Sequence, residues 1–145
     1  MKIKDKIYCT GIGVYSGQLT KRKSYIVEEI DTENVKVQND EGKLRWYSQF
    51  FFSADNEPEI TSINIDDPIE NIESDAIEVT ITFSNKVKYW MTFTTPKYLD
   101  KILDEESYFS SKHFMIIKHL TEESIKSTVL KLDEQDELIE NCQKY

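Results

Sequence analysis

The sequence predicts an α+β protein in which a small N-terminal β-barrel, residues 1–53, precedes a unit of element order βββαβα, residues 76–145. Short extended stretches alternate with turn residues across residues 1–53. A period-2 hairpin follows at 77–83 and 87–93, and helix-start signals stand at Thr95 and Thr121. A chain of 145 residues is long enough for one sizeable core or two small ones.

The N-terminal elements are short strands. Residues 6–10 and 24–30 have extended character and are separated by a glycine-containing loop. Val35 and Val37 alternate with polar neighbours, as in a half-buried strand. The turn at 39–42 ends in Gly42, which tolerates a positive φ, and residues 43–47 pair back. Several short strands in such a small segment are typical of a closed barrel.

A family resemblance accompanies this pattern. A long first loop, a three-stranded meander and an aromatic exit at Phe50, Phe51 and Phe52 together resemble the SH3-like barrel over residues 3–53. The resemblance implies an SH3-like topology for the N-terminal part.

Residues 54–75 are predicted to form an acidic linker or loop around one short strand, residues 60–65. The stretch 53–76 holds eight Asp and Glu residues and no Lys or Arg, together with Pro58 and Pro68. If the strand is an uncovered sheet edge, we expect it to be able to pair with a second copy as a homodimer.

The C-terminal elements are predicted from periodicity and capping signals. Apolar residues occupy every odd position of 77–83 and 87–93, which indicates an antiparallel hairpin with one buried face. Pro96 follows Thr95 as a first helical residue, and an apolar strand is expected at 114–118. The second helix begins after Thr121, and residues 133–137 are expected to break or expose its middle. We expect both helices to pack on one sheet face, through these residues: Tyr98, Leu99, Ile102 and Leu103 of the first, and Ile125, Val129, Leu132 and Ile139 of the second.

Few side chains are suited to catalysis. His113 and His119 lie six positions apart, which is too far for a ligand pair on one helix. Cys9 and Cys142 lack a catalytic signature, and we expect free thiols.

Carboxylate-based sites are also weakly indicated. Asp31, Glu41 and Lys43 have a loose nuclease-like spacing, but Glu41 falls in a predicted turn. The acidic segment lacks the glycine and the ligand spacing of an EF-hand. We predict no catalytic site, no metal site, no cofactor and no enzymatic activity.

The charge distribution indicates a basic protein partner. Residues 1–52 have a net charge of +2, whereas residues 53–145 carry nine Lys and Arg against twenty Asp and Glu, a net charge of −11. Such a surface attracts basic proteins and repels polyanions. The predicted partner-binding residues are Asp66, Asp67, Glu70, Glu73 and Asp75.

An alternative function uses the barrel. Lys21, Arg22 and Lys23, with Tyr15 and Trp46, combine positive charge with aromatic platforms, as in small barrels that bind single-stranded nucleic acid. On this hypothesis the protein is a nucleic-acid-binding accessory protein.

In size, acidity and shortage of catalytic groups, the whole chain resembles bacterial immunity proteins and small phage or mobile-element proteins. This resemblance implies a non-enzymatic inhibitor that neutralises a basic toxin or effector in a one-to-one complex. The longest apolar run, residues 114–117, is too short to cross a membrane, and no signal peptide is recognisable. We therefore expect a cytoplasmic protein without a membrane partner.

Overall fold

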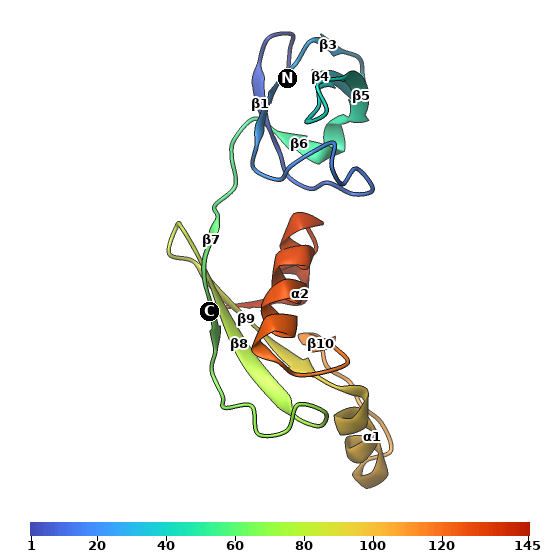
Figure 1. The fold of residues 1–145 in the computed structure, drawn as a ribbon, viewed down its shortest axis with the longest axis vertical. Helices are drawn as coiled ribbons and strands as arrows, with labels where there is room; N and C mark the ends of the chain where they lie inside the picture. Colours follow the sequence, from blue (N-terminus) through green and yellow to red (C-terminus); the bar gives the residue numbers. More distant parts are fainter. The chain divides into compact units, whose positions relative to one another are not determined.

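The computed structural model describes residues 1–145 and divides them into two compact units. The first unit is Met1–Glu57 together with the short segment Asp133–Asp136, and the second is Pro58–Leu132 with Glu137–Tyr145. Strands occur in both units, and two α-helices lie in the C-terminal part of the chain (Figure 1). The predicted mixed α+β class is confirmed.

The first unit contains two antiparallel sheets of three strands each. Their orders are β2-β1-β6 and β3-β4-β5. The strands are β1 (Lys6–Cys9), β2 (Ser24–Ile26), β3 (Glu29–Ile30), β4 (Asn34–Gln38), β5 (Leu44–Ser48) and β6 (Phe52–Ser53), with a 3-10 turn at Gln49–Phe51.

The stretch 24–30, expected to be extended, forms two short strands, because the chain changes sheets within it. β2 pairs with β1, whereas β3 pairs with β4, so the two halves hydrogen-bond to different neighbours. The pairings leave two separate sheets, and a closed barrel is not shown.

A common core fills the space between the strands of the first unit. Gly13 lies so close to the Phe51 ring that an added Cβ would approach it to 2.8 Å. Gly42 has φ +79° at the predicted turn between β4 and β5. The buried apolar residues are Ile7, Cys9, Ile12, Leu19, Tyr25, Val27, Val35, Val37, Tyr47 and Phe52.

The second unit is built on one sheet of order β10-β9-β8-β7, in which β11 also pairs with β9. The predicted hairpin is confirmed as β8 paired with β9, and β10 runs parallel to β9. The strands are β7 (Ile60–Ile65), β8 (Ala76–Phe83), β9 (Lys88–Thr94), β10 (Phe114–Ile116) and β11 (Gln143–Lys144).

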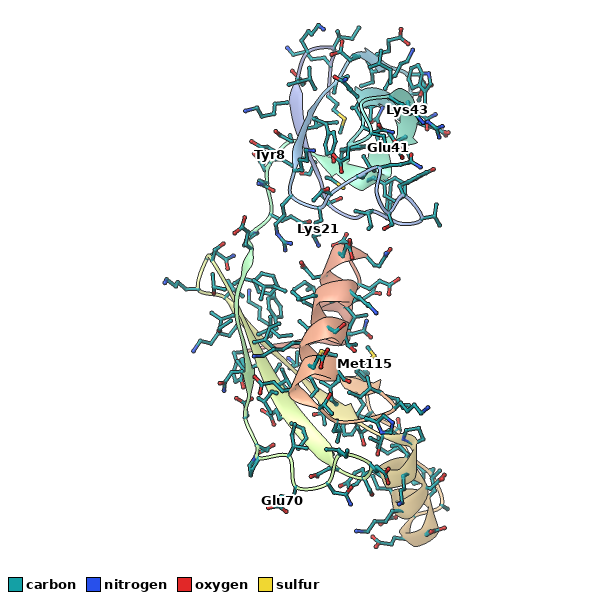
Figure 2. The ribbon with its side chains drawn as sticks, in the orientation of Figure 1. Tyr8, Lys21, Glu41, Lys43, Glu70 and Met115 are labelled. Atoms are coloured by element: carbon teal, nitrogen blue, oxygen red, sulfur yellow. The ribbon has the colours of Figure 1, made fainter.

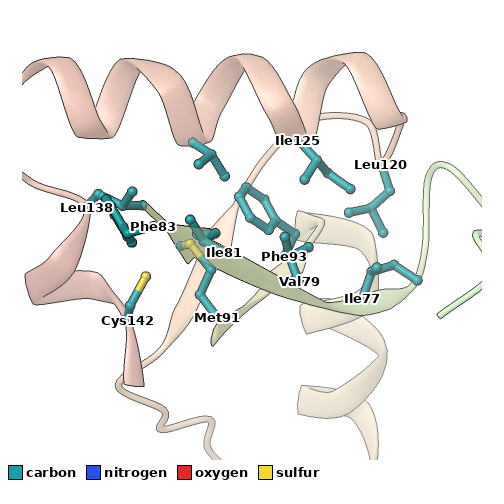
Figure 3. Packing of buried hydrophobic residues seen from close by; sticks show 11 residues of the cluster. Ile77, Val79, Ile81, Phe83, Met91, Phe93, Leu120, Ile125, Leu138 and Cys142 are labelled. Carbon is teal, nitrogen blue, oxygen red and sulfur yellow. The ribbon is translucent and has the colours of Figure 1, made fainter. Parts of the chain in front are cut away.

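One face of this sheet packs against α2 (Glu122–Glu134), as Figure 3 shows. Thr121 caps the helix, because its Oγ1 accepts a hydrogen bond from the Ser124 amide at 3.1 Å. Alternate residues of β8 and β9 meet apolar residues of the helix. The buried core is Ile77, Val79, Ile81, Phe83, Met91, Phe93, Leu120, Ile125, Val129, Leu138 and Cys142.

The second helix, α1 (Pro96–Glu105), corrects one expectation. Thr95 is its N-cap and accepts from the Tyr98 amide, as the Thr-Pro pair predicts. However, α1 contributes no residue to the buried core, and Leu103 is exposed. Figure 1 shows α1 beyond the end of the sheet, whereas α2 lies across it. The expectation that both helices cover one face is therefore wrong, because α2 and its flanking residues already fill that face.

The end of α2 corrects a second expectation. Asp136 has φ +59°, and the Glu137 amide donates to the Leu132 carbonyl, as in a Schellman motif that ends a helix. The chain continues into the 3-10 turn Ile139–Asn141, where Ile139 is exposed while Leu138 is buried. The predicted interruption at 133–137 is confirmed, and the core role expected for Ile139 is wrong. Neither helix has the length and apolar character that a membrane crossing requires.

Candidate functional site

The acidic segment connects β7 to β8 in the second unit. Asp66 follows β7 directly, and its carboxylate accepts hydrogen bonds of 2.6 Å from Thr80 Oγ1 and from Asn64 Nδ2. An oxygen of Asp67 lies 3.4 Å from the backbone nitrogen of Glu78. Both carboxylates are exposed, and no cation neutralises them.

The remaining predicted acids lie further along the same connection. Glu70 is exposed, and its side chain makes no hydrogen bond or ion pair (Figure 2). Glu73 lies 3.8 Å from Lys97 Nζ, an exposed pair of little energetic value. Asp75 accepts from the Ala76 amide at 2.8 Å. No group of three or more potential metal ligands converges here or elsewhere in the chain.

β7 is the edge of the sheet, and one side of its backbone is unpaired. Its only sheet neighbour is β8. The Asp66 amide donates to the Glu78 carbonyl at 3.0 Å, and this bond shows which residues along β7 direct their backbone groups toward β8. Hydrogen-bonded pairs alternate with non-bonded pairs in antiparallel strands. Asn64 and Ser62 lie two and four residues before Asp66, so their backbone groups also face β8. The backbone N–H and C=O groups of Ile63 and Ile65 therefore point away from β8.

The two faces beside β7 differ in chemistry. On the helix side, Ile63 and Ile65 lie opposite the core residues Ile81 and Val79 and pack against the core. On the outer side, Ser62 and Asn64 lie opposite threonines of β8.

Hollows border β7 on both faces. The helix side has two, of about 430 and 450 Å³, and both are lined by Ile63 and Lys126, so they form one groove between β7 and α2. Leu130, which is exposed, also lines this groove. A third hollow of about 550 Å³ lies on the outer face and is lined partly by Asn64, Asp66 and Tyr145. The edge is therefore accessible along its length.

The basic segment of the first unit is largely neutralised within that unit. Lys21 is only 7% exposed at its side chain, and its Nζ lies 3.2 Å from Glu57 and 3.4 Å from Asp133. Arg22 forms a bidentate pair with Asp133, with distances of 2.6 and 2.9 Å. Lys21 is thus surrounded by carboxylates and not free at the surface (Figure 2).

Two other members of the predicted nucleic-acid surface, Lys23 and Tyr15, also contact neighbouring side chains. Lys23 Nζ lies 2.6 Å from Asp40. Tyr15 packs edge-on against Tyr47, with ring centroids 5.0 Å apart. Trp46 is 45% exposed, and Lys36 Nζ lies 5.9 Å from its ring centroid. Trp46 is thus the accessible aromatic platform of the predicted set.

The other candidate groups do not form a site. Asp31 accepts from the Glu33 and Asn34 amides and so closes its own turn. Glu41 and Lys43 form an exposed pair at 3.5 Å across Gly42 (Figure 2). His113 packs edge-on against Trp90, and its buried Nδ1 has no hydrogen-bond partner.

Both cysteines are buried free thiols. Burial raises the pKa of Cys9 to about 11, although a backbone hydrogen bond with Gly11 acts in the opposite direction. Burial likewise raises the pKa of Cys142 to about 11.

We expect both thiols to react slowly with iodoacetamide at pH 8, because the thiolate is the reactive form. Mass spectrometry should find little alkylation of the native protein and complete alkylation in denaturant. Equal alkylation rates in the two states would contradict the burial of both residues.

Comparison of the chain with models of known protein families, with curated proteins and with solved structures finds no match. Sequence reasoning identified the acidic segment and the edge strand separately. It missed Lys126 and Leu130 of α2, which line the groove beside β7. The exposed apolar position of Leu130, outside the spacing of the core residues, is the signal that identifies it.

Proposed function

We propose that this protein is a non-enzymatic binding module whose second unit binds a basic partner protein, in the manner of small cytosolic immunity or inhibitor proteins. The supporting observation is a row of exposed carboxylates in the connection that follows an unpaired edge strand. Asp66, Asp67 and Glu70 are exposed, and none of them pairs with a cation of this chain. Complementary charge speeds encounter with a basic partner and disfavours acidic competitors.

The contrast between the two units supports this choice. In the first unit, Lys21 and Lys23 are each paired with carboxylates. Their charges are therefore partly cancelled close to where a phosphate would bind. In the second unit, the acids Asp66, Asp67 and Glu70 have no cationic partner within the chain. The binding of a basic protein is therefore favoured over the alternative, nucleic-acid binding through the first unit.

For the first unit we propose an SH3-like arrangement of its two sheets. Its support is the passage of one stretch, β2 and β3, from one sheet to the other, together with the resemblance of residues 3–53.

A charge-reversal variant tests the acidic surface. We expect Asp66→Lys/Asp67→Lys/Glu70→Lys to weaken binding to a panel of small basic proteins by about tenfold or more, because three attractive charges become repulsive. The measurement is isothermal titration calorimetry, and circular dichroism checks that each variant folds. Glu70→Lys alone is the safer variant, since Glu70 has no intramolecular partner to lose.

The matched control is Asp100→Lys/Asp104→Lys/Glu105→Lys in α1, which reverses three exposed acids of the same unit. The control changes the net charge equally, so we expect it to weaken binding by less than about threefold. Equal losses in both triple variants would attribute binding to net charge and refute the surface. Tight binding of a single-stranded oligonucleotide with a steep salt dependence would favour the alternative function instead.

A further inference from the structure

We propose that the unpaired edge of β7 binds an extended segment of the basic partner as an added β-strand. This inference rests on the proposed function and specifies how the partner is held. Strand addition at a sheet edge derives affinity from main-chain hydrogen bonds and selectivity from alternate side chains.

The backbone of β7 is ready for such pairing. The outward N–H and C=O groups of Ile63 and Ile65 have no partner within the chain. No Pro or charged residue interrupts Ile60–Ile65, although such residues commonly protect exposed edges. A register shift between Ile60 and Ser62 confines the regular ladder to Ser62 and the residues after it.

The two faces of β7 define the side chains of the incoming strand. Residues opposite Ile63 and Ile65 would point into the groove beside α2, whose lining includes Ile69 and Leu130. Apolar side chains suit these positions, because they extend the existing core. Residues opposite Ser62 and Asn64 would point to the outer face, where Asp66 and Lys88 both line the hollow. Lys88 lies in β9, which β8 and β7 separate from the incoming strand, whereas Asp66 follows β7 directly. Basic side chains therefore suit those positions, so the partner segment alternates apolar and basic residues.

Charge also distinguishes such a partner from a second copy of this chain. In a two-fold antiparallel pairing centred on Ile63, the end of β7 that follows Glu59 in one copy would approach the end that precedes Asp66 and Asp67 in the other. Acidic residues would therefore gather at both ends of the paired strands, and like charges that face one another destabilise a strand pair. Each copy would also bring a net charge of −9. A basic segment removes both costs, so the structure favours a foreign strand over the homodimer.

N-methylated peptides test the pairing directly. The probe is an end-capped peptide of alternating lysine and valine, about seven residues long, the length of an ordinary strand. One derivative carries N-methyl groups on the valines, whose N–H groups face β7 when the valines occupy the groove. The matched control carries N-methyl groups on the lysines, whose N–H groups face away from β7.

We expect the unmodified and lysine-methylated peptides to bind equally, and the valine-methylated peptide to bind about tenfold more weakly, because at least two main-chain hydrogen bonds are lost. Binding should slow hydrogen exchange at the Ile63 and Ile65 amides, measured by NMR. The exchange of Asn64, whose amide faces β8, should change least.

Other outcomes separate the two proposals. Equal affinity of all three peptides, with no protection of Ile63, refutes strand addition. If the charge-reversed triple variant nevertheless loses binding, the proposed function stands. Equal binding of the peptides by the wild type and by that triple variant refutes the proposed function itself. A stable dimer in sedimentation, dissociated by the unmodified peptide, would assign the edge to a second copy and overturn the choice of a foreign strand.

Discussion

Phe93→Ala is expected to lower the free energy of unfolding of the second unit by about 4 kcal/mol, the usual cost of removing a fully buried aromatic ring. Phe93 is 0% exposed, lies opposite Ile77 in the sheet and belongs to the core beneath α2 (Figure 3). Its removal leaves a cavity that the surrounding strands can fill only in part. Losses of this size approach the whole stability of a small domain.

The position of the two tryptophans allows each unit to be followed separately. Trp90 lies in the second unit and Trp46 in the first. Urea unfolding of Phe93→Ala in a Trp46→Phe background should show an early transition in Trp90 fluorescence. The matched control is Tyr108→Ala, an aromatic side chain of the same unit that is 71% exposed, and it should change stability by less than about 0.5 kcal/mol. A loss below about 1 kcal/mol for Phe93→Ala would contradict the packing described for this core.

Asp40→Asn is expected to destabilise the first unit by about 1 to 3 kcal/mol at pH 7, because it weakens a network of hydrogen bonds to a charged group. The Asp40 carboxylate accepts from Lys23 Nζ at 2.6 Å, Thr20 Oγ1 at 2.7 Å and Tyr25 Oη at 2.9 Å. Burial acts to raise the pKa of Asp40, but the hydrogen bonds outweigh it and hold that pKa below its usual range. Burial also raises the pKa of the Tyr25 phenol, which therefore remains a hydrogen-bond donor.

The pH dependence has a defined sign. Because the folded-state pKa of Asp40 is lowered, its stabilising contribution is fully present above the unfolded pKa of about 3.9. It is lost as the pH falls through the lower folded-state value. Unfolding of the first unit, followed by Trp46 fluorescence in a Trp90→Phe background, should lose less stability between pH 7 and pH 3 in Asp40→Asn than in the wild type.

Glu41→Gln is the matched control for Asp40→Asn. Glu41 is the next residue in the chain, is exposed, and makes only an exposed pair with Lys43. We expect it to alter stability by less than about 0.5 kcal/mol and to retain the wild-type pH dependence. An identical loss of stability between pH 7 and pH 3 in wild type and Asp40→Asn would show that Asp40 is not the titrating group.

Elements with strong local signals were predicted correctly. The β8–β9 hairpin follows from alternation, and the starts of α1 and α2 follow from Thr95 and Thr121. These features depend on neighbouring residues only, through side-chain periodicity and hydrogen bonds to the first helical amides. The strand predicted at 60–65 also coincides with β7.

Elements that depend on distant partners were predicted less well. The division of 24–30 into β2 and β3 results from pairing with different strands, which no local pattern encodes. The prediction for α1 was wrong for a similar reason. The spacing of its apolar residues shows that one side of the helix is apolar, but it does not show whether the sheet face has room for that side next to α2.

By itself, the sequence determined the α+β class, most strand and helix positions, and the concentration of acids between β7 and β8. The tertiary structure alone decided which charges stay available and which backbone groups stay unpaired. Asp40 neutralises Lys23 from seventeen residues away, and the position of β7 at the edge depends on how four strands are ordered. Both results arise from long-range contacts, whose geometry is set only when the whole chain has folded.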